Sequence, residues 1–401
     1  MKILTNILNP VSKTRTDFID NVVIEIENNI IQNITPLTKN TPLSNITDRR
    51  DIVVLPGLID AHTHLPQYPI IGKFGETLLK WLENYTFPIE KKFKEEEYAQ
   101  NLSKEFFLQL KRVGTTTAVI YSTVYQHTTD IAFQEAEKSN LRIVMGKVMM
   151  DQNSPYYLQE TPTKSLEESI YLSKKWHQKT EKLYYAYSPR FAIACSIGTM
   201  SMIKPSNTNN SFIQTHCNEN KQEKETIEQL YPDIPSYVEV YKEANLLGPK
   251  TILAHMVHNT REELELIKKT ETKVVHCPDA NFFLRSGRFP IEQFDEMNIN
   301  FGLGSDVGAG TSLSMFQIMK SMIFVQANNN IVVTTSRAFW HSTIANAEIL
   351  GLDEEIGSIE KGKKAEIIGI KIPNNYLHNA TDILSYLIFV EPSPPIEVIN
   401  L

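Results

Sequence analysis

The chain has 401 residues, of which 41% are hydrophobic and 22% charged, and its formal net charge at pH 7 is -7. This balance is typical of a globular protein, and the negative charge argues against a nucleic-acid or anionic-membrane partner. No stretch reaches the roughly 20 apolar residues of a membrane span, and we expect no targeting segment. The three cysteines are few and odd in number, which favours reduced thiols in a cytoplasmic protein: Cys195, Cys217 and Cys277.

Both ends of the chain are rich in strand-forming residues. Residues 22–26 and 30–34 flank Asn28-Asn29, which predicts a β-hairpin. Residues 37–50 are rich in Thr, Asn, Pro and Asp, and we expect a loop there. Short strand-like pieces return after residue 355. We therefore predict one small β-sandwich domain built from both termini, residues 1–55 and 353–401.

The next run, 53–65, leads from an apolar strand into His62-Thr63-His64. Residues i and i+2 of a strand share a face, so both imidazoles can point at one spot past the strand's end. Two neutral imidazoles that converge in this way form half of a metal site.

From residue 56 to about 352, apolar runs alternate with stretches of helical periodicity such as 100–113 and 262–269. This alternation predicts an α/β fold, and the favoured closed form is a (β/α)8 TIM barrel. The further strand candidates are 117–121, 142–148, 183–187, 212–216, 251–255, 273–276 and 300–303.

Several of these apolar runs end in a residue that can bind a metal ion. His216, His255 and Asp306 each close one run, and barrel enzymes keep their chemistry at the carboxyl ends of the strands. Neutral imidazoles and a carboxylate suit zinc or ferrous iron. Glu219, just after His216, could serve as the carboxylate that moves protons.

Other residues beside these runs remain ambiguous or structural. His276 also ends an apolar run, and it could be either a further polar group at the barrel mouth or a structural residue. Cys217 and Cys277 each follow a histidine, so a strand would aim them at the opposite face, and we expect them to pack rather than bind a metal.

Residues 56–68, PGLIDAHTHLPQY, resemble the guanine deaminase family of the amidohydrolase superfamily, Gln67-Tyr68 included. The superfamily hydrolyses C–N and related bonds at divalent metal ions. Further similar motifs follow in the family's order: 81–88 (WLENYTFP), 146–151 (GKVMMD), 188–191 (SPRF), 215–220 (THCNEN), 253–255 (LAH), 276–278 (HCP) and 302–310 (GLGSDVGAG).

The resemblance implies a zinc-dependent reaction in which metal-bound hydroxide attacks C2 of guanine and releases xanthine and ammonia, in purine catabolism or salvage. One zinc ion per subunit, or alternatively ferrous iron, would be held by His62, His64, His216 and Asp306. The implied catalytic residues are His255, Glu219 and Asp306. His255 would orient the hydroxide, Glu219 would shuttle a proton between the water and the purine ring, and Asp306 would help to deprotonate the water and pass its proton to the leaving amine.

The resemblance also implies how the ring is bound. Gln67 and Arg190 would hydrogen-bond its edges, Arg190 at O6, while Phe191 packs on its face and His216 and Glu219 contact the substrate. A homodimer is implied, and residues 81–93 could form a helical lid. The chain departs from the family's pattern at Asp279, Ala280 and Arg285, where a different ring preference could arise.

Three other functions stay open at this point. A related aminohydrolase could act on another purine, a pterin or a triazine. A binuclear amidohydrolase would need a carboxylated lysine on the fourth barrel strand, but residues 183–191 contain no lysine. A non-catalytic scaffold could keep the fold, although such proteins usually lose ligands, and every expected ligand type is present here.

Overall fold

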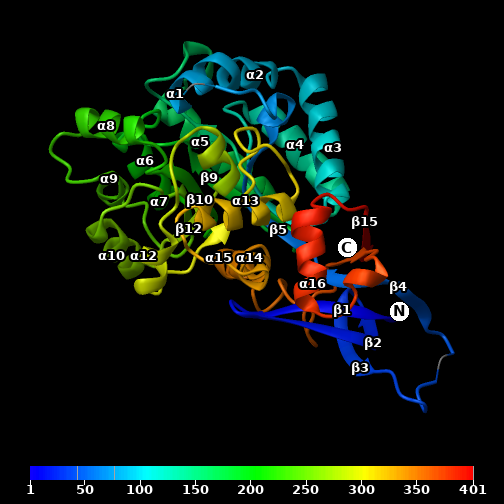
Figure 1. Cartoon of the computed structure of the whole chain (residues 1–401). Coiled ribbons are helices and arrows are strands. Elements are labelled where there is room, and N and C mark those ends of the chain that lie inside the picture. The colour runs from blue at the N-terminus through cyan, green and yellow to red at the C-terminus, as the bar shows by residue number, and fades with distance from the viewer. Residues whose placement is uncertain (43, 76, 401) are drawn as a thin grey trace. The chain divides into compact units, whose positions relative to one another are not determined.

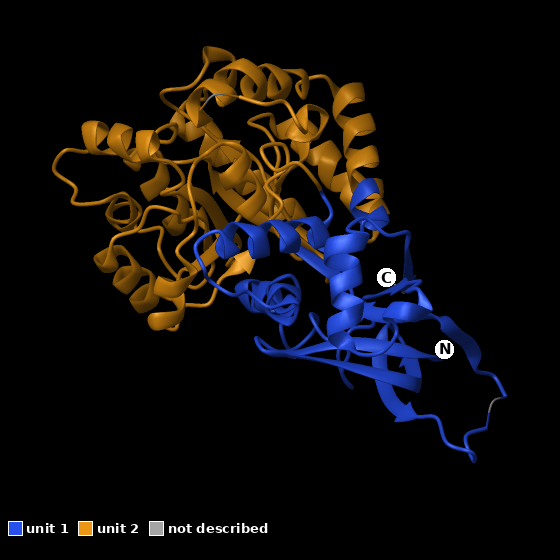
Figure 2. Cartoon of the chain, viewed as in Figure 1, with its two compact units in different colours: residues 1–60, 109–117, 313–401 blue, residues 61–108, 118–312 orange. Residues whose placement is uncertain are grey.

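The computed structural model describes residues 1–42, 44–75 and 77–400. It divides into two compact units (Figure 2). Unit 1 comprises residues 1–60, 109–117 and 313–401, and unit 2 comprises residues 61–108 and 118–312. A nearly closed parallel barrel and a separate mixed sheet from both termini confirm the predicted fold class (Figure 1).

The mixed sheet joins the first strands of the chain to the last ones. The predicted hairpin around Asn28-Asn29 is confirmed, and β14 pairs antiparallel with β4. Branched apolar side chains such as Ile7, Ile24 and Val54 form its core. In spatial order the strands are β15 (Ile396–Asn400), β14 (Ile367–Ile370), β4 (Thr47–Pro56), β1 (Lys2–Ser12), β2 (Arg15–Glu27) and β3 (Ile30–Pro36).

The predicted loop at 37–50 is wrong over its last four residues. Thr47 and Asp48 begin β4 and pair with Ile3 and Leu4 of β1. Polar residues enter a strand here because the ladder with β1 satisfies their backbone groups, which composition alone cannot reveal.

The barrel strands are almost wholly buried, as expected when helices cover a parallel sheet. Asp306 N–H donates to His62 O at 2.8 Å and His64 N–H donates to Val307 O at 2.7 Å, so the segment after the last strand bonds to the first. In order the strands are β5 (Leu58–His64), β6 (Thr115–Tyr121), β7 (Arg142–Gly146), β9 (Leu183–Pro189), β10 (Phe212–Cys217), β11 (Thr251–His255), β12 (Lys273–His276) and β13 (Gly302–Leu303), and β8 (Val148–Met149) pairs with β9.

Helices follow the strands along the chain, and the predicted helices at 100–113 and 262–269 correspond to α3 and α10. Within the described ranges, no helix is both long and apolar enough to cross a bilayer. The helices are α1 (Leu78–Trp81), α2 (Phe87–Lys92), α3 (Glu96–Arg112), α4 (Gln126–Ser139), α5 (Pro162–Trp176), α6 (Ile197–Ser201), α7 (Ile203–Ser206), α8 (Lys221–Leu230), α9 (Tyr237–Glu243), α10 (Arg261–Thr270), α11 (Pro278–Phe283), α12 (Ile291–Glu296), α13 (Met315–Ala327), α14 (Thr335–His341), α15 (Ile344–Leu350) and α16 (Ala380–Ser385).

Shorter helical turns complete the fold. Two π-helical turns follow directly on α1 and α16, at Leu82–Thr86 and Tyr386–Val390. The 3-10 turns are Leu65–Ile70, Tyr156–Leu158 and Asn374–Tyr376.

Candidate active site

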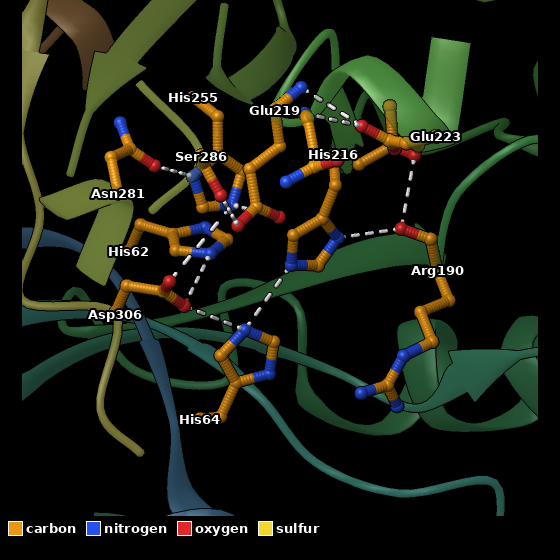
Figure 3. A network of polar contacts seen from close by, with 12 residues as sticks. His62, His64, Arg190, His216, Glu219, Glu223, His255, Asn281, Ser286 and Asp306 are labelled. Carbon is orange, nitrogen blue, oxygen red and sulfur yellow. Dashed lines mark hydrogen bonds and ion pairs between the residues drawn. The ribbon is translucent and has the colours of Figure 1, made fainter. Parts of the chain in front are cut away.

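Three imidazoles and one carboxylate converge at the carboxyl ends of the barrel strands (Figure 3). His62 and His64 end β5, His216 lies near the end of β10, and Asp306 follows β13. All four are buried, and one ligand atom from each lies within 4.8 Å of the others. The Nε2 atoms of His62 and His64 are each 3.2 Å from Oδ1 of Asp306. This group has the composition and spacing of a metal site.

Hydrogen bonding fixes which nitrogen of His216 faces the group. Its Nδ1 lies 2.6 Å from the backbone oxygen of Arg190, which can only accept, so Nδ1 carries the hydrogen. The lone pair of His216 Nε2 then points toward His64 Nε2, 3.2 Å away. Burial lowers the pKa of His64 to about 3 and that of His216 well below its usual value, so both rings are neutral at pH 7. Neutral nitrogens beside a carboxylate fit a divalent cation such as zinc.

Asp306 is held ionised in an unusual backbone conformation. Burial alone would raise its pKa, but hydrogen bonds from His62 and His64 hold the pKa well below its usual range. Its φ angle is 49°, in the left-handed region, and Gly310 N–H donates to its carbonyl at 2.6 Å. A strained residue fixed by its neighbours is common at functional sites.

Gly304 allows the end of β13 to approach His62. A Cβ placed on Gly304 would lie 2.6 Å from the Cβ of His62 and 2.9 Å from its backbone nitrogen. Any larger residue would displace this backbone or the imidazole. The glycine therefore sets the distance between the first and last barrel strands at the metal-binding group.

Glu219 and His255 form the second polar pair of the pocket. His255 Nε2 lies 3.5 Å from Glu219 Oε2 and 4.0 Å from Asp306 Oδ2. Ser286 donates its hydroxyl to Glu219 at 3.1 Å. Burial, reinforced by the charge of Asp306, raises the pKa of Glu219 to about 8. A carboxyl group with a pKa near neutrality can both hold and release a proton, as a general acid–base must.

The structure brings the sequence-predicted site residues together in one part of unit 2. His64, His216 and Asp306 of the metal-binding group line one pocket, and His62 lies next to these three residues. Trp81 and Leu82, from the segment predicted as a lid, also contribute to its wall. The pocket is lined by His64, Gln67, Leu78, Trp81, Leu82, Arg190, Phe191, His216, Glu219, Glu223, His255, Asp306 and Ala309.

Four polar residues that contact the site residues escaped the sequence analysis: Glu90, Glu223, Asn281 and Ser286. Asn281 Oδ1 lies 2.8 Å from His255 Nδ1 and fixes that ring, while Glu90 contacts Arg190 and Gln67. Glu90 and Glu223 lie on helices, where a carboxylate usually faces solvent. Their partners cannot be identified without the tertiary structure.

His276 and the two cysteines that follow histidines are all buried, but they have different neighbours. His276 is fully buried and stacks on Phe289 with ring centroids 4.4 Å apart. Cys277, expected only to pack, lies near His255 and Asp306, and ligand atoms of the three fall within 4.8 Å of one another. Cys217 is buried.

The residues at which the chain departs from the family's pattern lie outside the set that lines the pocket. Arg285 Nη2 donates to Gly75 O at 3.4 Å, and its guanidinium lies over Phe74. Asp279 accepts from the backbone N–H and the hydroxyl of Thr311. Ala280 is fully buried in α11.

Comparison with known proteins identifies relatives over most of the chain. The model of the amidohydrolase family matches residues 53–398. Guanine deaminase from Escherichia coli (strain K12) is 36% identical over 325 residues, 80% of this chain and 74% of that protein. Guanine deaminase from Dictyostelium discoideum is also 36% identical, over 82% of this chain and 76% of that protein. A crystal structure of guanine deaminase from C. acetobutylicum, with bound guanine in its active site, superposes with a TM-score of 0.93 at 28% identity, covering 98% of this chain and 97% of that chain.

Proposed function

Because the chain belongs to the amidohydrolase family, and within it to the guanine deaminases, we propose that it hydrolyses guanine to xanthine and ammonia. The observation that carries this proposal is the buried group of His62, His64, His216 and Asp306, three of which line one pocket together with Glu219. Hydrolysis of an aromatic amidine needs both an activated water and a proton donor for the ring, and this pocket contains groups suited to each task.

We propose that one zinc ion is held by His62, His64, His216 and Asp306, with ferrous iron as the alternative metal. The neutral state of the rings and the ionised state of Asp306 support this assignment. When bound, such an ion lowers the pKa of a water molecule to about 7 and so supplies a nucleophile near neutral pH.

Glu219, His255 and Asp306 are the proposed catalytic residues. Glu219 gives a proton to the ring nitrogen as C2 is attacked, which makes that carbon a better electrophile, and it takes back the proton of the added hydroxyl when ammonia leaves and the C2 carbonyl forms. His255, fixed by Asn281, uses its Nε2 to orient the attacking water. Asp306 accepts a proton from this water and passes it to the departing amine. The raised pKa of Glu219 suits a group that starts the cycle protonated.

Recognition of the ring is assigned mainly to three other residues that line the pocket, Gln67, Arg190 and Phe191. We propose that Arg190 donates to O6 of guanine, that Gln67 bonds a second edge, that Phe191 packs on the ring face, and that His216 and Glu219 complete the contacts. Arg190 and Gln67 are buried, and buried polar groups discriminate strongly against a ring that leaves them unmatched.

A panel of rings tests the substrate assignment. The zinc-loaded protein is incubated with guanine, adenine, cytosine, 8-oxoguanine and a pterin, and ring products are separated by chromatography. The proposal predicts xanthine from guanine and little product from the others. Turnover of a different ring would keep the hydrolase and contradict guanine as substrate, while silence on all rings with zinc bound would favour a non-catalytic scaffold.

Two further expectations accompany this function. We propose a cytoplasmic location, supported by three buried free cysteines that suit a reducing compartment. A homodimer is proposed from the family resemblance, and analytical ultracentrifugation would test it through the mass in solution.

A further inference from the structure

One buried carboxylate contacts both residues proposed to bind the ring edges. Glu90, on α2, is 1% exposed and lies outside the set of residues that line the pocket. Its two oxygens accept from Arg190 Nη1 at 2.9 and 2.8 Å. Its Oε1 also accepts from Gln67 Nε2 at 3.0 Å. Glu90 therefore holds Arg190 and Gln67, two residues of the pocket wall, without lining the pocket itself.

This contact fixes the orientation of the Gln67 amide. An ionised carboxylate can only accept hydrogen bonds, so the side of Gln67 that faces Glu90 must be its NH2 group. The carbonyl Oε1 then lies on the other side, 3.4 Å from the backbone nitrogen of Gly308. Glu90 thus determines where the NH2 group and the carbonyl oxygen of Gln67 lie relative to a bound ring.

Glu90 also gives the Arg190 guanidinium its charge partner and its position. Both hydrogen bonds use Nη1, and the ring of Phe87, on the same helix, lies 5.5 Å from the guanidinium carbon. Arg190 is 3% exposed, and a buried charge needs a close partner of opposite sign. A guanidinium has five N–H donors, so donors remain for a ligand.

We propose that Glu90 is a positioning residue that sets the ring preference of the pocket, by directing Arg190 toward a carbonyl oxygen and by fixing the donor and acceptor of Gln67. The inference rests on the proposed function, because ring preference is defined for a pocket that takes a purine. It assigns to α2 a part in substrate selection although Glu90 touches no substrate.

Replacing Glu90 by glutamine would remove these constraints with little change in shape. An amide has one acceptor oxygen and one NH2 group, so Arg190 or Gln67 would face a donor. Arg190 would also lose its charge partner. The amide of Gln67 could then rotate and the guanidinium could shift, which weakens binding of a ring that carries O6 more than binding of one that lacks it.

The test compares guanine with 2-aminopurine, which keeps the amidine edge and lacks O6. The zinc-loaded wild type, Glu90→Gln and a matched control, Glu97→Gln, are assayed for kcat and KM with guanine and for the inhibition constant of 2-aminopurine. Glu97 is exposed on α3, outside the segment 81–93 that is predicted as a lid. We expect Glu90→Gln to raise the KM of guanine about 10- to 100-fold, with a smaller change in kcat.

The decisive quantity is the ratio of the 2-aminopurine inhibition constant to the KM of guanine. We expect this ratio to fall at least about tenfold in Glu90→Gln and to stay unchanged in Glu97→Gln. An equal loss of affinity for both rings, or an unchanged ratio, would overturn the inference and leave Glu90 with a structural role.

A second variant covers the case in which Glu90→Gln does not fold. Glu90→Asp keeps the charge but withdraws the carboxylate by one methylene, about 1.5 Å, so it cannot reach both partners. Its ratio should fall in the same direction, and an unchanged ratio would contradict the inference. A wild type without activity on guanine would instead contradict the proposed function, whereas an active wild type with unaltered Glu90 variants contradicts only the role of Glu90.

Discussion

Glu223 fixes the backbone that carries the proposed proton carrier. Its Oε2 accepts from the backbone nitrogens of Glu219 and Asn220 at 2.9 and 3.3 Å, and Tyr237 donates to its Oε1 at 2.8 Å. Burial, with the nearby charge of Glu219, raises the pKa of Glu223 to about 7. The same carboxylate completes the capping box of α8, so one residue both starts the helix and positions Glu219.

We therefore predict that Glu223→Gln lowers kcat about 10- to 100-fold, because an amide oxygen is a weaker acceptor than a carboxylate for the two backbone N–H groups that position Glu219. The unfolding free energy should fall by about 1–3 kcal/mol. Steady-state kinetics and urea unfolding measure the two effects. Glu225→Gln, an exposed change on the same helix, is the control and should match the wild type. An unchanged kcat in Glu223→Gln would show that Glu219 needs no such support.

Gly304→Ala should displace His62 and so disturb the metal-binding group. The new methyl group would have to move the His62 backbone or ring, so we expect the free energy of unfolding to fall by about 1–3 kcal/mol. Activity should drop about 100-fold or more through the displaced imidazole. Gly198→Ala is the control, since its Cβ would meet only Ser196 Oγ at 3.7 Å. A fully active Gly304→Ala protein would show that the strand end can relax without moving His62.

The grouping of His62, His64, His216 and Asp306 could be predicted because these residues lie at the ends of apolar runs. His62 and His64 repeat at the spacing of a strand face, and Asp306 ends a segment that a barrel places at the same rim. The supporting residues give no such signal. Glu90 and Arg190 are 100 residues apart in the chain, and nothing in the local sequence of α2 distinguishes a buried glutamate from a solvated one.

At the scale of elements, residues 78–92 form a run of short helical turns beside the pocket. Trp81 and Leu82 contribute to the pocket wall, and the indole N–H of Trp81 donates to Lys73 O at 2.7 Å. The lid interpretation predicts that bound xanthine slows amide hydrogen exchange in residues 81–93 by about tenfold or more, because closure removes openings to solvent. Helix α10, which contributes no residue to the pocket wall, serves as the internal reference. Equal exchange with and without xanthine would contradict a lid.

Strands and helices with a regular pattern were predictable, and irregular boundaries were not. The run 251–255 corresponds residue for residue to β11 because its apolar stretch ends at the polar His255. The start of β4 at Thr47 depends on pairing with β1, which lies more than 40 residues earlier in the chain. Such long-range hydrogen bonds override composition. The domain boundaries at 55 and 352 stay a prediction.

At the scale of the whole molecule, buried neutral histidines predict acid sensitivity. Burial lowers the pKa of His276 to about 3, whereas an unfolded chain titrates near pH 6.5. Between these pH values the unfolded state binds more protons than the folded state. The stability that the neutral His276 contributes is therefore complete above about pH 6.5 and is lost as the pH falls toward 3. Protonation of this residue in the unfolded chain should lower the free energy of unfolding by about 2 kcal/mol between pH 7 and pH 5.

His276→Leu should flatten this dependence, measured as the urea midpoint at each pH on metal-free protein. The exposed change His378→Gln should keep the wild-type dependence. If the urea midpoint of His276→Leu changed with pH as it does in the wild type, the pKa of His276 would be the same in the folded and unfolded states, which contradicts the prediction.

A metal-binding group and Glu219 are proposed to deaminate guanine together, and the release of ammonia is the direct readout of that reaction. Wild type and Glu219→Gln, each with its zinc content measured, are given guanine under identical conditions. We expect rapid ammonia release by the wild type and a loss of at least about 100-fold in Glu219→Gln at equal zinc content. Equal rates in the two proteins would contradict the role of Glu219, and no release by the zinc-loaded wild type would contradict the function itself.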